Sequence, residues 1–305
     1  LSLHDALPIL AWGNMGLAAF ELGRFTEAET ALRAAAVLAQ DLGDRYHESS
    51  YRGSLGNTLR ALGRLHEAEA CFRQALRLAR EISDQKSEEL ALGNLGILLF
   101  QIGRMNEAIA SLESARALSL SLAEIQHAAH DAYHLGVAYR EIGDDLAAGV
   151  SFQECLRLAE QARDVATQRG ALEALAYLAM NRNDWPEAAA YLRRAEFLNP
   201  QEVDTYNAAS LVMVWGHWYY QQGQYEQAAG QWREAITLNE ASNNPFSVLT
   251  ASLNYGGALV MNGRYTEASH ILKTALQQAQ VMAIPDEERV IWEGLGLVNE
   301  LQGHM

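Results

Sequence analysis

Residues 13–23 read GNMGLAAFELG, residues 53–63 read GSLGNTLRALG, and residues 93–103 read GNLGILLFQIG. The three stretches start 40 residues apart, and each has Gly at its first, fourth and eleventh positions. A fixed period of this length is typical of repeat architectures, in which each unit covers the apolar face of the next.

The period continues to the end of the chain in four separate registers. The eleventh position recurs as Gly143, Asn183, Gly223, Gly263 and Gly303, and the fourth recurs as Gly136, Ala176, Gly216, Gly256 and Gly296. One alanine series is Ala28, Ala68, Ala108, Ala148, Ala188, Ala228 and Ala268, and the other is Ala35, Ala75, Ala115, Cys155, Ala195, Ala235 and Ala275. Four registers with one period exclude coincidence.

Each register has a physical interpretation. Gly23 and its equivalents end a helix in the left-handed conformation, which Gly adopts at least cost and Asn183 at the next lowest. Gly16 and its equivalents lie in mid-helix, where Gly costs about 1 kcal/mol relative to Ala. This cost predicts the close approach of a second helix. The large residues between the alanines are Leu32, Phe72, Leu112, Phe152, Leu192, Trp232 and Leu272.

The junctions between repeats carry acidic or amide residues that predict helix caps. They are Asp44, Asp84, Asp164 and Asp204, with Glu124 and Asn244 in the same register. Each repeat is therefore expected to hold a helix of roughly 17 residues, a short turn at the Gly, and a second helix of similar length.

The pattern of Leu-Gly, Tyr, Ala, an aromatic residue and Ala resembles the tetratricopeptide repeat. It is carried by Leu135, Gly136 and Tyr139, then by Tyr219, Ala228, Trp232, Ala235 and Asn199-Pro200. The longer spacing, with GNLG at 93–96 and Leu55-Gly56-Asn57, is similar to the Leu-Gly-Asn-repeat-enriched G-protein modulators and to bacterial signalling proteins. The resemblance implies an all-α, right-handed α-solenoid of about seven and a half helix-turn-helix repeats.

This solenoid is expected to cover residues 10–305. Residues 1–9, LSLHDALPI, look like a translated sequencing adapter, and the alternative is a genuine N-terminal segment. Both ends of the solenoid are expected to be incomplete. Uncapped repeat ends expose apolar faces, so self-association through them is also expected.

Composition limits the partners. The net charge is −15 and no run of Lys and Arg is present, which argues against direct nucleic-acid binding. No apolar stretch is long enough for a membrane span, and two cysteines make no disulfide framework, so a cytoplasmic protein is expected. All basic residues except Lys86 and Lys273 are Arg, a weak indication of a bacterial source.

The family resemblance implies that the first helix of each repeat lines a concave groove. The groove positions lie six, three and two residues before the mid-helix Gly and one, four and five after it, which is one helical face. They give a candidate peptide-binding set of Asn14, Asn57, Arg60, Asn94, His134, Arg140, Tyr177, His217, Tyr220 and Asn254.

The chemistry of these positions suits a peptide. Each Asn amide offers both a donor and an acceptor to a peptide backbone, and the alternative is that the Asn residues bond neighbouring repeats. Arg60 and Arg140 either pair with acidic groups of a ligand or are simply solvated. Gly13, Gly53 and Gly93 either leave the groove floor open to a ligand backbone or allow closer helix packing.

Catalytic and cofactor signals are absent from the sequence. It has no His-Glu-x-x-His, no Gly-x-Ser-x-Gly and no phosphate loop, so we expect neither an enzyme nor a cofactor. His127, His130 and His134 share one helical face and form a weak metal-site candidate, the alternative being a polar stripe in the groove.

Two functions remain. The first is a protein–protein interaction scaffold that binds a peptide segment of a partner in its concave groove. The second is the sensor or regulatory arm of a larger bacterial signalling ATPase, transcription activator or kinase, with the catalytic domain outside these residues.

Overall fold

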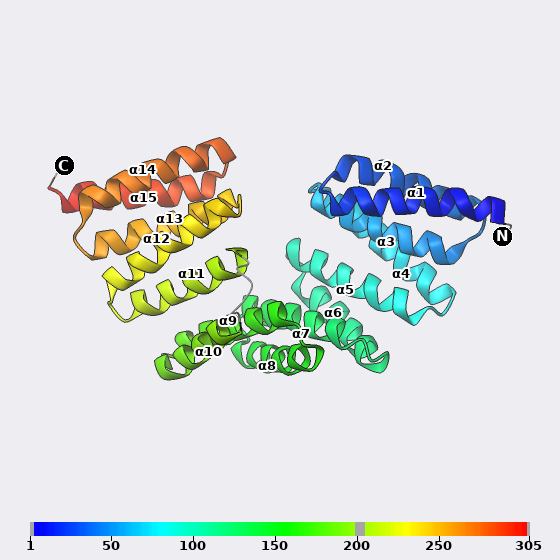
Figure 1. The fold of residues 1–305 in the computed structure, drawn as a ribbon, viewed down its shortest axis with the longest axis horizontal. Coiled ribbons are helices and arrows are strands. Elements are labelled where there is room, and N and C mark those ends of the chain that lie inside the picture. Colours follow the sequence, from blue (N-terminus) through cyan, green and yellow to red (C-terminus); the bar gives the residue numbers. More distant parts are fainter. Residues whose placement is uncertain (1–2, 199–204, 304–305) are drawn as a thin grey trace. The chain divides into compact units, whose positions relative to one another are not determined.

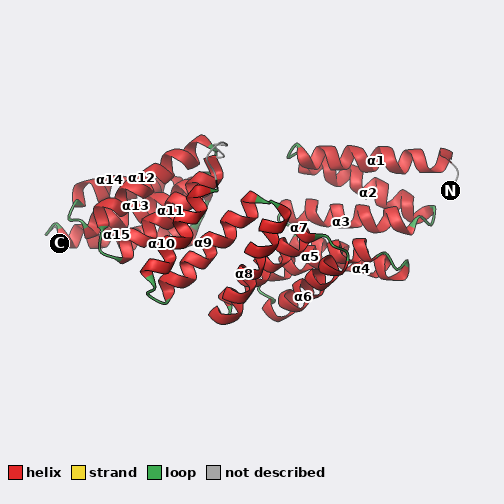
Figure 2. Ribbon diagram, turned by 60° about the horizontal axis from the view of Figure 1, so that its bottom comes forward, coloured by secondary structure: helices red, strands yellow, loops and turns green. Residues whose placement is uncertain are grey.

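A computed structural model describes residues 3–198 and 205–303, and every regular element within them is a helix (Figures 1 and 2). The helices are α1 (Leu3–Glu21), α2 (Phe25–Asp41), α3 (Arg45–Ala61), α4 (Leu65–Glu81), α5 (Gln85–Gln101), α6 (Met105–Ser121), α7 (Ile125–Glu141), α8 (Asp145–Ala162), α9 (Val165–Asn181), α10 (Trp185–Phe197), α11 (Thr205–Gln221), α12 (Tyr225–Ala241), α13 (Pro245–Met261), α14 (Tyr265–Met282) and α15 (Pro285–Leu301).

The chain forms two compact units, Leu1–Ala171 and Leu172–Met305. Within each unit, successive helices pack against one another as antiparallel pairs (Figure 1). This confirms the predicted all-α helical-repeat solenoid and the helix length of about 17 residues. Helix α1 starts at Leu3, and Ile9 is only 1% exposed and lies in the core of the first unit. The assignment of residues 1–9 to a non-native segment stays a prediction.

The large residue of each second helix packs against the mid-helix Gly of the first helix, as the low helix propensity of Gly predicted. A Cβ atom added at Gly136 would lie 2.5 Å from the Phe152 ring, and one added at Gly216 would lie 2.3 Å from the indole nitrogen of Trp232. Gly16, Gly56, Gly96 and Gly256 meet Leu32, Phe72, Leu112 and Leu272 in the same way. Contacts this short leave no room for any side chain other than hydrogen.

The turns use left-handed residues twice per repeat. Gly23 and its equivalents have positive φ, and Asn183 takes φ 60° in its predicted place. The left-handed residue of the second turn, between one repeat and the next, was not predicted, because most of the residues at this position are not Gly. They are Gly43, Ser83, Ala123, Arg163, Asn243 and Ala283.

Most of the predicted caps are present. The side chains of Asp44, Asp84, Asp164 and Asn244 each accept a hydrogen bond from a backbone N–H in the first turn of the following helix. Glu124 makes no side-chain cap, because its longer side chain pairs instead with Lys86, and Asp204 lies outside the described residues. Asp144 and Asp184, which were not predicted, cap the second helices α8 and α10.

An arginine at the start of a second helix joins neighbouring repeats. The Arg64 guanidinium lies 2.7 Å from a carboxylate oxygen of Glu29 in the preceding repeat, and it also pairs with Glu67 in its own helix. Arg104 and Arg264 repeat the arrangement. These pairs are exposed, so each contributes little to the free energy of unfolding, but they account for part of the arginine content.

Substituting Gly136→Ala is expected to lower the free energy of unfolding by about 1–3 kcal/mol, because the added methyl group overlaps the fully buried Phe152 ring. The matched control is Gly296→Ala, in the same register, where an added Cβ meets nothing within 4 Å. That change is expected to raise the free energy by up to about 1 kcal/mol. Urea unfolding of both variants measures the difference, and equal effects would contradict the packing role of Gly136.

Substituting Ala123→Gly is expected to raise the free energy of unfolding by about 0.5–1 kcal/mol. Ala123 is exposed and has φ 58°, a conformation that costs Ala about 1–2 kcal/mol, and the gain is reduced by the greater freedom of Gly in the unfolded chain. The reverse change, Gly103→Ala at φ 80°, should lower stability in the same thermal melt. A loss of stability in Ala123→Gly would contradict this reasoning.

Candidate functional site

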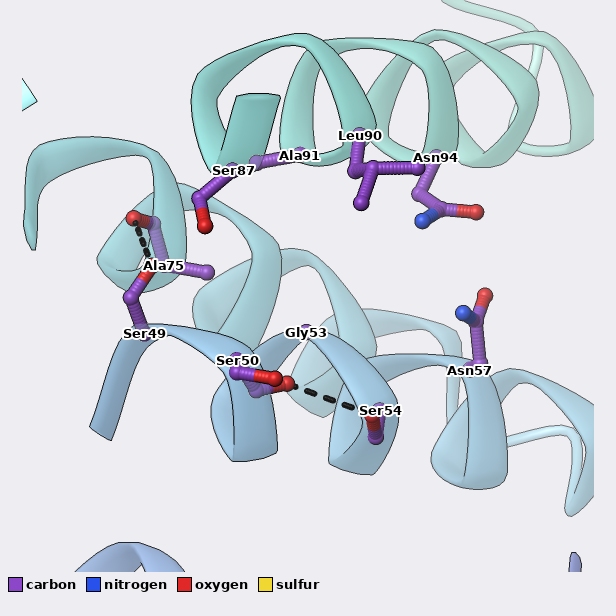
Figure 3. Close-up of a pocket in the computed structure, with 10 residues that line it drawn as sticks. All are labelled: Ser49, Ser50, Gly53, Ser54, Asn57, Ala75, Ser87, Leu90, Ala91 and Asn94. Carbon is purple, nitrogen blue, oxygen red and sulfur yellow. Dashed lines mark hydrogen bonds between the residues drawn. The ribbon is translucent and has the colours of Figure 1, made fainter. Parts of the chain in front are cut away.

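The first unit contains a pocket of about 200 Å³ between α3 and α5 (Figure 3). It is lined by Ser49, Ser50, Gly53, Ser54, Asn57, Ala75, Ser87, Leu90, Ala91 and Asn94. Six of these ten occupy positions that the repeat register assigns to the groove: Ser50, Gly53, Ser54, Asn57, Leu90 and Asn94. Asn57 and Asn94 of the predicted peptide-binding set are among them, and their role in binding a peptide stays a prediction.

The hydroxyl groups of the pocket are largely satisfied by the protein. Ser49 donates to the Ala75 carbonyl at 3.0 Å, and Ser54 donates to the Ser50 carbonyl at 3.2 Å. The amides of Asn57 and Asn94 extend toward one another from α3 and α5 (Figure 3). The Oδ1 atom of Asn57 is buried and has no hydrogen-bond partner within the described structure. The amides are thus the polar groups of the pocket left for a ligand.

The sequence left open whether Gly13, Gly53 and Gly93 allow close helix packing or open the groove floor to a ligand, and the structure shows that they differ. An added Cβ would lie 2.1 Å from the Tyr51 ring at Gly13 and 3.1 Å from the Asp131 carboxylate at Gly93, so both glycines allow close helix packing. At Gly53 an added Cβ meets nothing within 4 Å, and Gly53 lines the pocket. Only Gly53 leaves the floor open to a ligand backbone.

Arg60 lies one helical turn beyond Asn57 on α3. It is half-buried, its Nε atom has no hydrogen-bond partner, and it forms no ion pair within the described structure. Burial lowers the pKa of Arg60, whereas hydrogen bonds to Glu side chains raise the pKa of Arg64 and Arg104. Arg60 is therefore a partly desolvated cation without a counterion.

His134 on α7 faces the same region. Burial first, and then the charges of His130 and Arg60, lower the pKa of His134 to about 4. Its imidazole is therefore neutral at neutral pH, and it can offer a hydrogen bond but no charge. Of the remaining candidates in this unit, Asn14 is exposed and Arg140 is half-buried.

The second unit gathers its candidates into an aromatic cluster. The rings of Tyr177 and His217 are 5.7 Å apart between centroids. The Tyr220 ring lies edge-on to Tyr225 at 5.2 Å and is tilted relative to Trp232 at 5.5 Å. Burial lowers the pKa of His217. Tyr177 lines a separate pocket of about 270 Å³ with Met213 and Phe246, but His217, Tyr220 and Asn254 do not line it.

The three histidines proposed for a metal do not converge. The Nδ1 atom of His127 lies 3.1 Å from a carboxylate oxygen of Glu89, and the Nε2 atom of His130 lies 3.3 Å from one of Asp164. These carboxylates belong to different repeats. Among residues 3–198 and 205–303, no three side chains form a metal-binding group.

A buried acidic pair near the pocket was not predicted from the sequence. Glu89 on α5 and Asp131 on α7 are 2% and 5% exposed, and Glu89 pairs with His127. Ser119 lies 3.2 Å from Asp131 and 3.1 Å from the Ala115 carbonyl, but it has only one hydrogen to donate. A protonated Asp131 can donate to Ser119 while Ser119 donates to Ala115, so the network is complete when Asp131 is neutral.

Burial, reinforced by the charge of Glu89, raises the pKa of Asp131 to about 7. In the unfolded chain this carboxyl ionises near pH 4. Between pH 4 and pH 7 the unfolded state therefore loses a proton that the folded state keeps, and stability falls as the pH rises. Above pH 7 this contribution no longer changes.

Substituting Asp131→Asn should remove that loss. The amide can donate to Ser119 without ionising, so the variant is expected to be more stable than the parent at pH 8 by roughly 2–4 kcal/mol and nearly equal to it at pH 4.5. Chemical denaturation at both pH values measures this, with the exposed Asp41→Asn as the control. A gain that is the same at both pH values would show that Asp131 is ionised in the folded state.

The remaining sequence features have structural roles. Cys155 is buried, which raises its pKa to about 12, and Cys71 is half-buried with a raised pKa, so both are packing residues. Within the described part of the chain, no helix combines the length and apolar character required to cross a membrane.

One family model of the tetratricopeptide repeat matches residues 8–81, and a second model of this repeat matches residues 54–121 and 214–283. Neither is a model of a catalytic family. No curated protein matches the sequence.

Solved structures share the fold at low identity. The apo form of RapI is 13% identical with a TM-score of 0.75, and the match covers 90% of this chain and 98% of that one. The quorum sensor NprR from B. thuringiensis, in its apo form, is 16% identical with a TM-score of 0.74, over 90% and 77% of the two chains. A signal transduction ATPase with a tetratricopeptide repeat sensor from Pyrococcus horikoshii is 14% identical with a TM-score of 0.71, over 93% of this chain and 44% of that one.

Proposed function

We propose that this chain, which belongs to the tetratricopeptide repeat family, is a protein-interaction scaffold that binds a peptide segment of a partner protein along the first-helix face of its first unit. The observation that carries the proposal is the pocket between α3 and α5, where Asn57 and Asn94 present their amides from opposite walls. The Asn57 amide oxygen is buried without a partner, and a small rotation of this side chain toward the pocket would let a ligand N–H reach it, which would offset the roughly 1–3 kcal/mol that an unpaired buried acceptor costs.

A peptide backbone suits this pocket because it alternates donors and acceptors, as the two amides do. The absence of a side chain at Gly53 gives the backbone room to approach the floor. The aromatic and polar positions of the second unit, Tyr177, His217, Tyr220 and Asn254, are proposed as further contacts. Affinity should be moderate, since a flexible peptide loses conformational entropy when it binds.

A second candidate is a sensor or regulatory arm of a larger signalling protein, which we take to be bacterial and cytoplasmic. The likeness to the repeat sensor of a signal transduction ATPase, of which this fold covers 44%, favours it. The two functions share the groove and differ in what else the gene encodes. The sequence of the full-length gene distinguishes them, since a catalytic or DNA-binding domain beside the repeats would favour the second.

The test begins with a displayed peptide library selected against the protein. Changing Asn57→Ala or Asn94→Ala in the pocket is expected to weaken a selected peptide about five- to tenfold, since each removes hydrogen bonds worth about 1 kcal/mol. Arg140→Ala should also weaken the peptide if the contact extends to α7. Isothermal titration calorimetry measures the affinities.

The controls lie on second helices. Arg157 on α8 is exposed, so Arg157→Ala should leave binding unchanged. Arg73→Ala is a less clean control because Arg73 pairs with Glu69 and Glu107. If Arg157→Ala weakens the peptide while Asn57→Ala and Asn94→Ala do not, the groove is the wrong face.

A further inference from the structure

We infer that the peptide bound by the first unit is acidic, and that a side-chain carboxylate of an Asp or Glu within it is seated on Arg60. The inference rests on the proposed function, because it names the chemistry of the segment that the groove takes.

The surroundings of Arg60 contain few groups that could compete for it. The chain carries a net charge of −15, yet none of the ten residues lining the adjoining pocket is Asp or Glu. The nearest buried acids along α3 and α5 already have partners: Glu48 pairs with Arg45 and Arg52, and Glu89 pairs with His127. The lining of this pocket is thus free of acidic side chains, although the chain as a whole is acidic.

Arg60 itself is in a state that a carboxylate would improve. A half-buried guanidinium has lost part of its hydration, and its Nε atom has no hydrogen-bond partner. Neighbouring His134 is neutral and supplies no negative charge. Arginine binds carboxylates through two parallel N–H···O bonds, and such charge-assisted bonds are about twice as strong as neutral ones.

The register of the groove indicates that the carboxylate belongs to a side chain and not to a peptide's C-terminus. Four residues after the mid-helix Gly, successive first helices of this unit carry Phe20, Arg60, Phe100 and Arg140. The row therefore continues past Arg60 in both directions, toward α1 on one side and toward α5 and α7 on the other, so a bound chain can pass through.

The spacing of this row predicts a ligand pattern. Packed helices lie about 8–10 Å apart, so Arg60 and Arg140, two first helices apart, are separated by roughly 16–20 Å. An extended chain rises about 3.3 Å per residue, so this separation spans about five or six residues. The expected ligand has two acidic residues five or six positions apart, with an apolar residue between them that meets Phe100.

The experiment uses a library of twelve-residue peptides displayed with their C-termini fused to the carrier, so that no free C-terminal carboxylate is present. Selected sequences are then synthesised with acetylated and amidated ends and measured by fluorescence anisotropy against the whole chain. We expect Asp and Glu to be enriched at the stated spacing. Replacing the seated Glu by Gln in the peptide should weaken binding about ten- to a hundredfold.

The protein variants separate charge from structure. Arg60→Gln should weaken binding to the same extent, and combining it with the Glu→Gln peptide should cause little further loss, because the two groups form one contact. Arg60→Lys should retain part of the affinity. The matched control is Arg157→Gln, which removes one charge from an exposed second helix and should leave binding unchanged. The peptide-side change keeps the test valid even if an Arg60 variant is unstable.

Three results would overturn the inference. Selected peptides without acidic residues, insensitive to Arg60→Gln but weakened by Asn57→Ala, would leave the proposed function standing and remove the carboxylate contact. Binding that the amidated peptides lack, but that the same sequences show when synthesised with a free C-terminal carboxylate, would assign the anion to a chain end. Failure to select any peptide, with no effect of the groove variants, would remove the proposed function and this inference with it.

Discussion

The insertion of one large side chain against a glycine of the preceding helix is the contact on which the rest of this structure depends. In each complete glycine-bearing pair, the Cβ position of the glycine is occupied by a Leu, Phe or Trp that comes sixteen residues later. Because a Cβ atom at these glycines would overlap the inserted side chain, the contact fixes both the separation and the register of the two helices. The flanking alanines let the backbones approach closely enough for the insertion, as at Ala148 beside Phe152.

That fixed register also determines what the first helices present on their other face. Gly56 holds one side of α3 against α4. The positions two residues before Gly56 and one and four residues after it must then face the neighbouring first helix or the groove. Asn57 and Arg60 are placed in this way and not by contacts of their own, which is why polar atoms of both lack partners. A scaffold of this kind can vary its binding surface without changing its core, since the two sets of positions do not overlap.

Many charged side chains of the first unit pair or are buried within the scaffold, whereas Arg60 faces the groove without an acid beside it. The arginines at the starts of second helices have carboxylates from two repeats around them, and the acids between first helices, Glu89 and Asp131, are buried beneath the groove. Arg60 stands apart from both sets, as a partly desolvated cation with no acid beside it. Buried Asp131 carries a stability cost at neutral pH that a neutral amide would avoid, and we propose Arg60 as the cation that is left for a ligand.

The periodicity of the sequence determined the helices, the turns at Gly23 and its equivalents, the capping residues and the face that carries the candidate site, because local backbone preference and side-chain size act within one or two turns of chain. Three things were decided only by the tertiary structure. Gly13 and Gly53 occupy the same register, yet one packs on Tyr51 and the other opens a pocket, because the neighbouring helix carries different side chains. The three histidines share a helical face, but His127 and His130 pair with carboxylates from two different repeats. Nothing in the repeat pattern singled out Asp131, whose raised pKa depends on its burial and on the charge of Glu89, forty-two residues earlier.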